Sequence, residues 1–392
     1  MLIGIVGKPN VGKSTFFKAA TMADVLIANY PFATIKPNHG IAYVKIDCIE
    51  KNFNVKCNPR EGYCINGKRF VPIELMDVAG LVEGASEGKG LGNQFLNDLS
   101  NADAFIQIVD ISGETDAEGK QTTNYDPLDD IVVIERELDL WYTGILKKVW
   151  KTFSKKFSSE NLDFSEAVAK QFSGLKVNRE HVNKVILNTG FDSKKSAQWN
   201  DEEIFIFASN LRKISKPMII AANKIDRPNS KENLEKLKKK FDYIIIPCSA
   251  ESELALKEAA KKEIINYIPG ESDFKINKNL SDKQKNALEF IKENILNKYK
   301  STGVQEILNK VVFELLNYIA VFPAGAKLSD SKGNILPDCF LLPNNSTALD
   351  FAYHLHTDIG NNFVKAINVK TKKAVGKDYK LNHLDGIEIM TK

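Results

Sequence analysis

One stretch near the start of the chain has the residue types and the spacing needed to bind a triphosphate. It reads Gly7-Lys8-Pro9-Asn10-Val11-Gly12-Lys13-Ser14, followed by Thr15, and matches the pattern G-x-x-x-x-G-K-[ST]. In such loops backbone N–H groups surround the phosphates, the lysine ammonium contacts the β- and γ-phosphates, and the serine hydroxyl binds Mg²⁺. We therefore predict that this loop binds a nucleotide, that Lys13 takes part in catalysis, and that Ser14 is a Mg²⁺ ligand.

A second motif can complete the metal site. Asp77-Val78-Ala79-Gly80 follows residues 70–76, which are expected to form a strand. In D-x-x-G motifs the carboxylate holds a water of the Mg²⁺ ion and the glycine N–H meets the γ-phosphate. The tetrapeptide is a weak signal alone and a strong one in this order after a phosphate loop. We predict catalytic roles for Asp77 and Gly80, and we place Asp77 at the Mg²⁺ ion.

Two further motifs point to guanine as the base. Asn223-Lys224-Ile225-Asp226 follows the strand-like run 217–222, at the edge where open α/β sheets bind ligands. The Asp226 carboxylate can accept hydrogen bonds from N1–H and N2–H₂ of guanine, whereas adenine has no such pair of donors. Asn223 would brace the loop, and the Lys224 stem would cover the base. Cys248-Ser249-Ala250-Glu251 matches the element whose backbone N–H binds guanine O6.

The elements around these motifs indicate an α/β fold, that of a P-loop NTPase domain. Apolar runs alternate with helical segments, which predicts a mostly parallel sheet with helices on both faces. These runs are residues 2–6, 41–49, 70–76, 104–110, 217–222 and 243–247. The chain between the fourth and fifth runs is far longer than one crossover helix needs, so we predict a helical insertion at about 126–212.

The rest of the chain divides into further parts. Residues 253–267 are expected to form a helix that closes the nucleotide-binding domain, 1–269. A Lys- and Asn-rich helical connector should follow at 270–318. From 319 to 392 the sequence changes to short strands and turns, which indicates a separate α+β domain.

The composition is that of an ordered globular protein, with 43% hydrophobic and 27% charged residues among 392. The first apolar run is too short for a signal peptide and no segment is long enough for a transmembrane helix, so we expect a cytoplasmic location and no membrane partner. A net charge of +4 is compatible with an RNA partner, while DNA is not expected. Basic clusters such as Lys238-Lys239-Lys240 are more often solvated helix faces.

Five cysteines, an odd number, argue for a reducing compartment rather than a disulfide scaffold. Three of them, Cys48, Cys57 and Cys64, surround a turn-rich loop, so their thiols could lie close together. Their spacing does not match a zinc ribbon, and no fourth ligand is obvious nearby. Ordinary thiols are therefore the preferred interpretation, with a structural metal or redox site as the alternative.

Together the motifs resemble those of the Obg-type GTPases, in particular the YchF-like archaeal branch with a helical insertion and a C-terminal TGS domain. The likeness spans essentially the whole chain and is carried by residues 29–38 (NYPFATIKPN), 77–85 (DVAGLVEGA) and 88–96 (GKGLGNQFL). It implies that Thr34 binds Mg²⁺ and the γ-phosphate and takes part in catalysis. It also implies that 319–392 is a β-grasp TGS domain of the kind found in RNA- and ribosome-associated proteins.

Three residues refine the expected activity. YchF proteins proper have glutamate at the last position of the motif that here reads Asn223-Lys224-Ile225-Asp226, and they prefer ATP. Asp226 departs from that pattern. Leu81 stands where Ras-like enzymes place a water-orienting glutamine, which predicts slow hydrolysis. Asn10 occupies a position where GTPases that bind K⁺ often have asparagine, so K⁺ is a candidate second cofactor beside Mg²⁺.

We therefore expect a slow GTPase that acts as a nucleotide-dependent switch. Its partner would be the ribosome or RNA, bound through the TGS domain and the basic helices. One alternative is a YchF-like ATPase. Another is a GTP-gated adaptor in stress signalling with negligible turnover.

Overall fold

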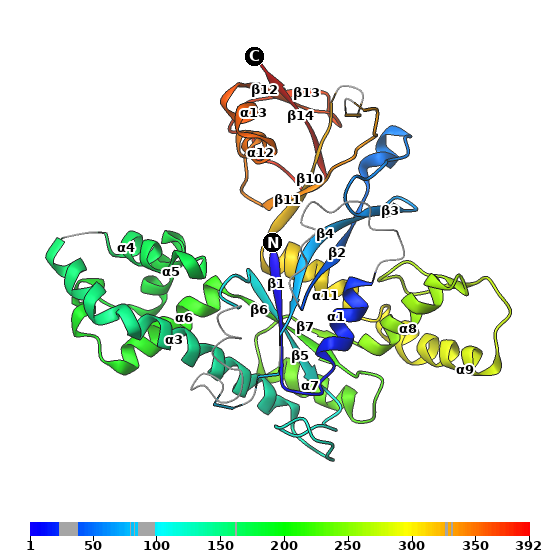
Figure 1. The fold of residues 1–392 in the computed structure, drawn as a ribbon, viewed down its shortest axis with the longest axis horizontal. Helices are drawn as coiled ribbons and strands as arrows, with labels where there is room; N and C mark the ends of the chain where they lie inside the picture. Colours follow the sequence, from blue (N-terminus) through cyan, green and yellow to red (C-terminus); the bar gives the residue numbers. More distant parts are fainter. Residues whose placement is uncertain are drawn as a thin grey trace.

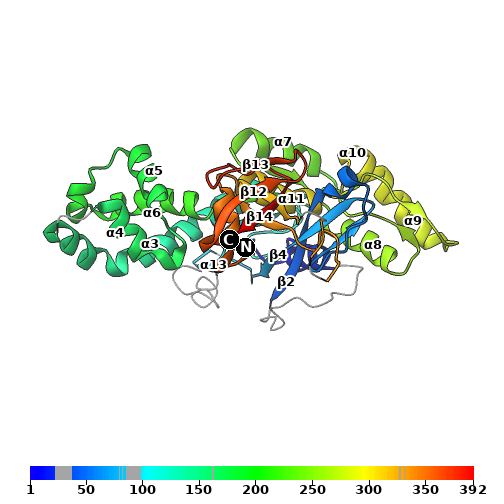
Figure 2. The same cartoon turned by 90° about the horizontal axis from the view of Figure 1, so that it is seen from above.

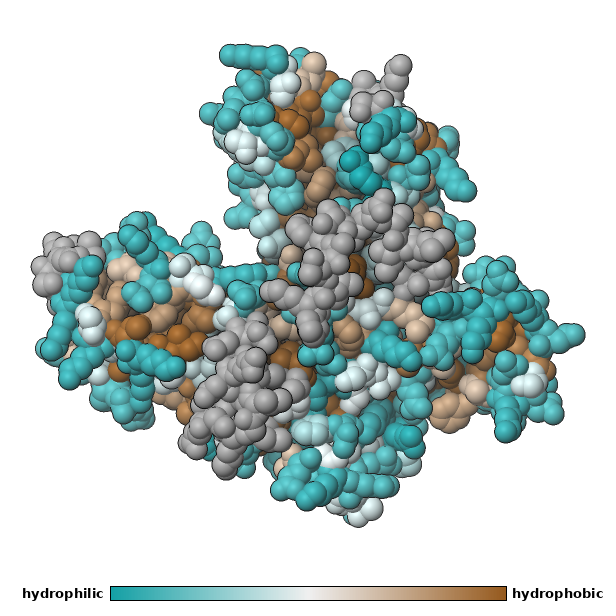
Figure 3. Space-filling model, viewed as in Figure 1, coloured by the Kyte–Doolittle hydropathy of each residue, from teal (hydrophilic) through white to brown (hydrophobic). Residues whose placement is uncertain are grey.

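Figure 1 shows a computed structural model of the chain, with a central sheet, two helical arms and a C-terminal unit. The structure describes residues 1–22, 38–78, 80–81, 83–84, 99–160, 163–325, 328–330 and 332–392. The arms extend on opposite sides of the sheet, and the C-terminal unit lies between them (Figures 1 and 2). In the view of Figure 3 the arms are mainly hydrophilic, with hydrophobic residues at the centre of the 127–215 arm. None of the described helices combines the length and the apolar character needed to span a membrane.

The central sheet has seven strands in the order β2-β4-β1-β5-β6-β7, with β3 paired to β4. The pairs β4-β1, β1-β5, β5-β6 and β6-β7 are parallel, and β2 and β3 run antiparallel to β4. The strands are β1 Leu2–Val6, β2 His39–Asp47, β3 Tyr63–Ile65, β4 Lys68–Asp77, β5 Ala104–Asp110, β6 Met218–Asn223 and β7 Ile245–Pro247. The mostly parallel sheet predicted from the apolar runs is confirmed. Residues 48–49 do not belong to β2, because a 3₁₀ helix, η1 (Ile49–Phe53), begins there.

Helices cover both faces of this sheet, and the strand pattern shows why. In β5, Phe105 and Val109 belong to one core cluster while Ile106 and Ile108 belong to another, as expected when successive side chains point to opposite faces. On the first face lie α3 (Pro127–Glu160) and α7 (Ser230–Lys240). On the second lie α1 (Lys13–Thr21) and α11 (Val304–Lys310). Burial on both faces explains the near-continuous apolar strands.

The helical insertion is present as an arm built from α3, α4 (Phe164–Gln171), η3 (Ser173–Leu175), α5 (Arg179–Thr189), η4 (Ser193–Gln198) and α6 (Asp201–Ser215). Its core is aromatic: the Trp150 and Trp199 rings stack at 5.4 Å, and Phe207 packs within 5.6 Å of Trp150. Asn200 caps α6 with a complete capping box with Glu203, which fixes where that helix starts.

The second arm departs from the predicted helix 253–267. α8 spans Ala250–Lys261 and ends early, because Glu263 takes a left-handed backbone conformation (φ 55°) and Ile265–Asn266 form strand β8. β8 pairs with β9 (Lys275–Ile276), and the connector continues as α9 (Asp282–Ile291), η5 (Lys292–Leu296), α10 (Asn297–Tyr299), α11 and η6 (Val311–Leu315).

The C-terminal unit is a five-stranded sheet in the order β11-β10-β14-β12-β13, in which β10 and β14 are parallel. Its core contains Phe351 of α12 packed with Val321 and Ile387 of the sheet, as expected for a β-grasp fold. The elements are β10 Tyr318–Pro323, β11 Phe340–Pro343, α12 Ala348–Leu355, α13 Thr357–Asn361, β12 Phe363–Asn368, β13 Lys373–Val375 and β14 Asp385–Thr391.

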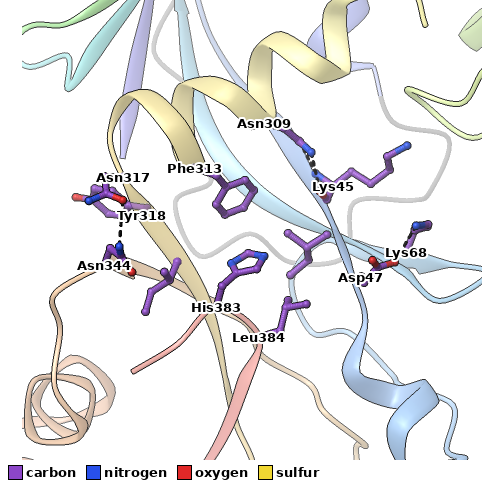
Figure 4. A pocket seen from close by; sticks show the side chains of 12 residues that line it. Lys45, Asp47, Lys68, Asn309, Phe313, Asn317, Tyr318, Asn344, His383 and Leu384 are labelled. Atoms are coloured by element: carbon purple, nitrogen blue, oxygen red, sulfur yellow. Dashed lines mark hydrogen bonds and ion pairs between the residues drawn. The ribbon is translucent and has the colours of Figure 1, made fainter. Parts of the chain in front are cut away.

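A pocket of about 550 Å³ marks the seam between the sheet domain and this unit (Figure 4). Among its lining residues, Phe313 and His383 pack edge to face with ring centroids 5.0 Å apart, and the His383 ring accepts a hydrogen bond from the Ala320 N–H. Asn344 donates to Asn317 on another wall. The C-terminal unit therefore packs on η6 and on the end of β2, far from the phosphate loop.

Candidate nucleotide-binding site

The phosphate loop joins the end of β1 to the start of α1, as predicted. Gly7 (φ 150°) and Gly12 (φ 99°) have backbone conformations that side chains rarely adopt. A Cβ on Gly7 would lie 2.6 Å from the Ile108 carbonyl oxygen, and one on Gly12 would lie 2.4 Å from Asn223 Nδ2. Only glycine therefore fits at either position. The loop leads its N–H groups into the N-terminus of α1, which is favourable for phosphate.

Lys13, Ser14 and Asp77 meet beside this loop. Lys13 Nζ donates to the Lys8 carbonyl oxygen over 2.7 Å, and burial lowers the pKa of Lys13 to about 8, against the attraction of Asp77. Burial also raises the pKa of Asp77, although a hydrogen bond with Ser14 opposes the change. A buried ammonium ion with one carbonyl partner has donors available for phosphate oxygens.

The donor set next to α1 fits a divalent cation. Asp77 Oδ1 is buried and has no hydrogen-bond partner among the described residues, an arrangement that costs free energy unless a cation or water satisfies it. The Ser14 hydroxyl, which contacts the same carboxylate, supplies a second oxygen. Hard oxygen ligands of this kind suit Mg²⁺. Thr34 and Ala79 lie outside the described residues, so the role of Thr34 at the metal stays a prediction.

Gly80 and Leu81 hold the D-x-x-G segment against the phosphate loop. The Leu81 N–H donates to the Gly7 carbonyl oxygen at 3.0 Å, and a Cβ on Gly80 would lie 2.8 Å from Pro9. The Leu81 side chain is 1% exposed and belongs to the core that α3 shares with the sheet. Leu81 is therefore a packing residue and presents no polar group to an attacking water.

Asn223, at the end of β6, joins three motifs. Its Nδ2 donates to the Val11 carbonyl oxygen at 2.9 Å, and its Oδ1 accepts from the Ala250 N–H at 3.0 Å. The Ile225 N–H donates to the Cys248 carbonyl oxygen at 3.1 Å. The segment that carries Asp226 is thereby fixed beside Ser249, Ala250 and Glu251 at the start of α8, where the Ser249 hydroxyl accepts from the Ser252 N–H. The two base motifs thus lie together at the carboxyl edge of the sheet.

Lys224 is oriented by a residue that the sequence reasoning missed. The Lys224 Nζ lies 2.7 Å from Asp110 Oδ2. Asp110 is the last residue of β5 and lies opposite Asn223 of β6 in the register of the sheet. Asp110 also accepts from the Ser112 and Thr115 hydroxyls. Burial favours a raised pKa for Asp110, but the bonds from Lys224 and Ser112 outweigh it and hold the pKa below its ordinary value. The sequence did contain one signal for this role, because Asp110 is an acidic residue at the end of β5, the strand before the one that leads into the base motif.

A hairpin after β5, residues 111–126, covers the middle of the phosphate loop and was also missed. Lys8 is 3% exposed: its Nζ donates to the Thr115 carbonyl oxygen, pairs with Asp130 at 2.9 Å, and lies 3.9 Å from the centre of the Tyr125 ring. Asn10 Nδ2 donates to the Gly119 carbonyl oxygen at 2.9 Å. The side chains of Lys8 and Asn10 are therefore turned to the hairpin, and Lys8 offers a nucleotide only its backbone.

Comparisons with known protein families agree with this architecture. Residues 2–137 match the family described as 50S ribosome-binding GTPase, and residues 221–325 match the Obg-like GTPase YGR210-like, G4 motif-containing domain. Residues 319–391 match the TGS domain. The last match identifies the β-grasp unit, and the second covers Asn223 to Asp226.

Similar proteins cover between two thirds and all of the chain. An uncharacterized GTP-binding protein of Methanocaldococcus jannaschii is 48% identical over 100% of this chain and 99% of its own. The ribosome-binding ATPase YchF of Bacillus subtilis is 33% identical over 67% of this chain and 69% of its own. The crystal structure of a GTP binding protein from Pyrococcus horikoshii superposes with a TM-score of 0.80 at 38% identity, covering all of both chains.

Proposed function

The chain belongs to the Obg-like family of P-loop NTPases, and within it we propose a GTP-specific, Mg²⁺-dependent hydrolase of low intrinsic rate that acts as a switch on the ribosome. The observation that carries the proposal is the Asn223 side chain, which joins the phosphate loop to both base motifs through buried hydrogen bonds. Because one residue connects the elements that would hold the phosphates and the base, they are positioned to bind a single nucleotide.

Asp226 is the reason to choose GTP over ATP. Relatives such as the Bacillus subtilis protein are named ATPases, so the family alone does not fix the base. A carboxylate at this position pairs with the two donors of guanine and would remain unpaired beside adenine. Lys224, which pairs with Asp110, would support the same loop.

The preference for guanine can be tested by replacing the Asp226 carboxylate, a hydrogen-bond acceptor, with an amide that can donate. Asp226→Asn should weaken GDP binding by about 10²-fold and strengthen binding of xanthosine diphosphate, whose C2 carbonyl accepts a hydrogen bond. Isothermal titration calorimetry with GDP, ADP and xanthosine diphosphate measures both changes. Asp242→Asn, at an exposed position, is the matched control. Tighter binding of ADP than of GDP by the unmodified protein would favour the ATPase alternative.

The chemistry follows from the residues beside the loop. Lys13 would leave the Lys8 carbonyl oxygen and bind the phosphates, while Ser14, Asp77 and Thr34 would hold Mg²⁺, Asp77 through a water. When bound, the cation supplies charge stabilisation to the phosphoryl group in transfer. The Gly80 N–H would contact the γ-phosphate. Since Leu81 is buried, no side chain at that position orients the water, which supports a low intrinsic rate.

K⁺ is proposed as a second cation because of Asn10. Its amide nitrogen donates to the Gly119 carbonyl oxygen, so the amide oxygen is the atom that would bind K⁺. GTP turnover in K⁺ buffer should exceed turnover in Na⁺ buffer at equal ionic strength, and Asn10→Ala should abolish the difference. Equal turnover in both buffers would remove K⁺ from the proposal.

A ribosomal partner is supported by the TGS domain and by relatives named ribosome-binding. Such a partner implies a cytoplasmic protein. The full chain should co-sediment with ribosomes more strongly with a non-hydrolysable GTP analogue than with GDP, and ribosomes should raise single-turnover hydrolysis. Identical sedimentation in both states would argue against a switch on the ribosome. Sedimentation without stimulated hydrolysis would favour the GTP-gated adaptor.

A further inference from the structure

Outside the nucleotide site, four potential metal ligands converge at the β2–β3 edge of the sheet. Cys48 follows β2, Glu50 lies in η1, Cys57 lies in the loop after it, and Cys64 lies in β3. Their ligand atoms all lie within 4.8 Å of one another. From this geometry we propose that Cys48, Glu50, Cys57 and Cys64 form a structural zinc site.

The distances fit a tetrahedral ion. Cys48 Sγ lies 3.7 Å from Cys57 Sγ, and Cys64 Sγ lies 3.5 Å from Glu50 Oε1. Two thiolates bound at 2.3 Å to one tetrahedral zinc ion are about 3.8 Å apart. Thiolate-rich tetrahedral sets select zinc over Mg²⁺ or Ca²⁺, which take oxygen ligands.

The structure supplies the fourth ligand that the sequence did not reveal. Glu50 is only two residues from Cys48, and the 3₁₀ turn brings its carboxylate over the thiols. Glu50 Oε2 accepts a hydrogen bond from the Cys57 N–H at 2.7 Å, which leaves Oε1 directed at Cys64. A second hydrogen bond to a ligand in this way fixes its orientation.

The position of the set indicates what the metal does. With four protein ligands the site has no open position, which is typical of structural rather than catalytic zinc. It encloses the loop 54–62, which docks on the TGS domain: the Asn58 N–H donates to the Ile335 carbonyl oxygen at 2.8 Å and the Arg60 N–H to that of Pro337 at 2.9 Å. The zinc ion would therefore set the shape of the surface that holds the TGS domain.

Metal analysis of the full chain tests the site. Protein produced in zinc-supplemented medium and purified without chelators should contain one zinc ion per chain by mass spectrometry. Cobalt replacement should produce the thiolate charge-transfer and tetrahedral d–d bands. Cys57→Ser and Glu50→Gln should lose the metal, and Glu50→Gln retains an oxygen acceptor for the Cys57 N–H. Cys339→Ser, a half-buried thiol outside the set, should keep it.

Each alternative result overturns the proposal in a distinct way. Absence of bound zinc and of cobalt bands in the unmodified chain would refute a metal site. A Cys48–Cys57 disulfide in protein purified under reducing conditions would assign the thiols to redox chemistry, and bound iron would refute zinc. Loss of zinc from Cys339→Ser would refute the ligand set. GDP binding by each variant shows that it is folded, and cobalt titration of the unmodified chain requires no variant.

Discussion

The nucleotide site and the cysteine cluster are assembled in opposite ways. The nucleotide site is built over long distances in the chain: Asn223 bonds to Val11, 212 residues away. The cluster lies within one short segment, residues 48–64. Nevertheless the motifs predict the long-range site residue by residue, whereas the spacing of the local cluster favours ordinary thiols and leaves a metal or redox site as the alternative. A site can therefore be predicted from the sequence when its residues match a known motif. Closeness of the residues along the chain is not enough without such a motif.

The largest expected effect is at Lys13. Lys13→Ala removes the ammonium ion from the phosphates, and we expect GTP turnover to fall by about 10²–10³-fold. The fold should persist, because a buried lysine with a lowered pKa contributes little to stability. Single-turnover hydrolysis measures the loss, with exposed Lys18→Ala as the control. A change of less than tenfold would mean that Lys13 does not contact the phosphates. Zinc content should be unchanged, which separates the two sites.

Asn223→Ala tests whether one side chain unites the nucleotide site. It leaves the Val11 carbonyl and the Ala250 N–H without their buried partner, at a cost of about 2–4 kcal/mol shared between folding and nucleotide binding. Urea unfolding with and without GDP separates the two contributions. Asn210→Ala removes an amide from a half-buried helix position, where it bonds only within its own helix, and should cost far less. Equal effects of the two substitutions would contradict the assigned role.

The pH dependence sharpens the account of Lys13. Because its pKa in the free protein is about 8, the ammonium ion is progressively lost above pH 8, and nucleotide affinity should fall by up to about tenfold per pH unit there. The nucleotide-free protein should change in the opposite direction: the unfolded state binds the proton more tightly, so this residue's contribution to stability rises between pH 8 and 10.5. GDP titrations across this range measure the change in affinity, and urea unfolding of the nucleotide-free protein measures the change in stability, each with Lys13→Met for comparison. A flat affinity profile would be inconsistent with this pKa.

The smallest expected effect comes from removing zinc, and removal of Mg²⁺ provides the contrast. A zinc-selective chelator should lower the melting temperature by a few degrees and speed proteolysis of the 54–62 loop, while GDP affinity stays the same. Omitting Mg²⁺ should abolish turnover and leave that loop protected. The chelator should have no effect on Cys57→Ser. A chelator that abolished GDP binding would show that the two regions are coupled rather than independent.

Much of the site and fold followed from the sequence because local rules and tertiary packing agreed. Near-continuous apolar strands predicted the parallel sheet, and the order of the motifs predicted what lies at its carboxyl edge. The failures fall where no regular pattern exists. The 111–126 hairpin has a single isolated bridge, Thr115 to Gln121, so no periodicity revealed it. Asp110 and Asp130 each pair with a lysine, Lys224 and Lys8 respectively, that only the tertiary fold brings near.

The boundary errors have physical reasons of the same kind. The predicted helix 253–267 continued past α8 because nothing in the local composition signals the left-handed turn at Glu263. The predicted strand 41–49 continued past β2 and hid the 3₁₀ turn that places Glu50 over the thiols. In the second case the predicted strand ended two residues too late, and this error concealed Glu50 as a metal ligand.

The ion pair between Lys8 and Asp130 connects the phosphate loop directly to the start of α3. Asp130 lies in the first turn of α3, which is 34 residues long and therefore extends for about 50 Å. A tilt of only about 5° at that first turn would displace the far end of a rod of this length by about 4 Å. An ångström-scale adjustment around bound phosphate would thus be amplified at the tip of the helical arm.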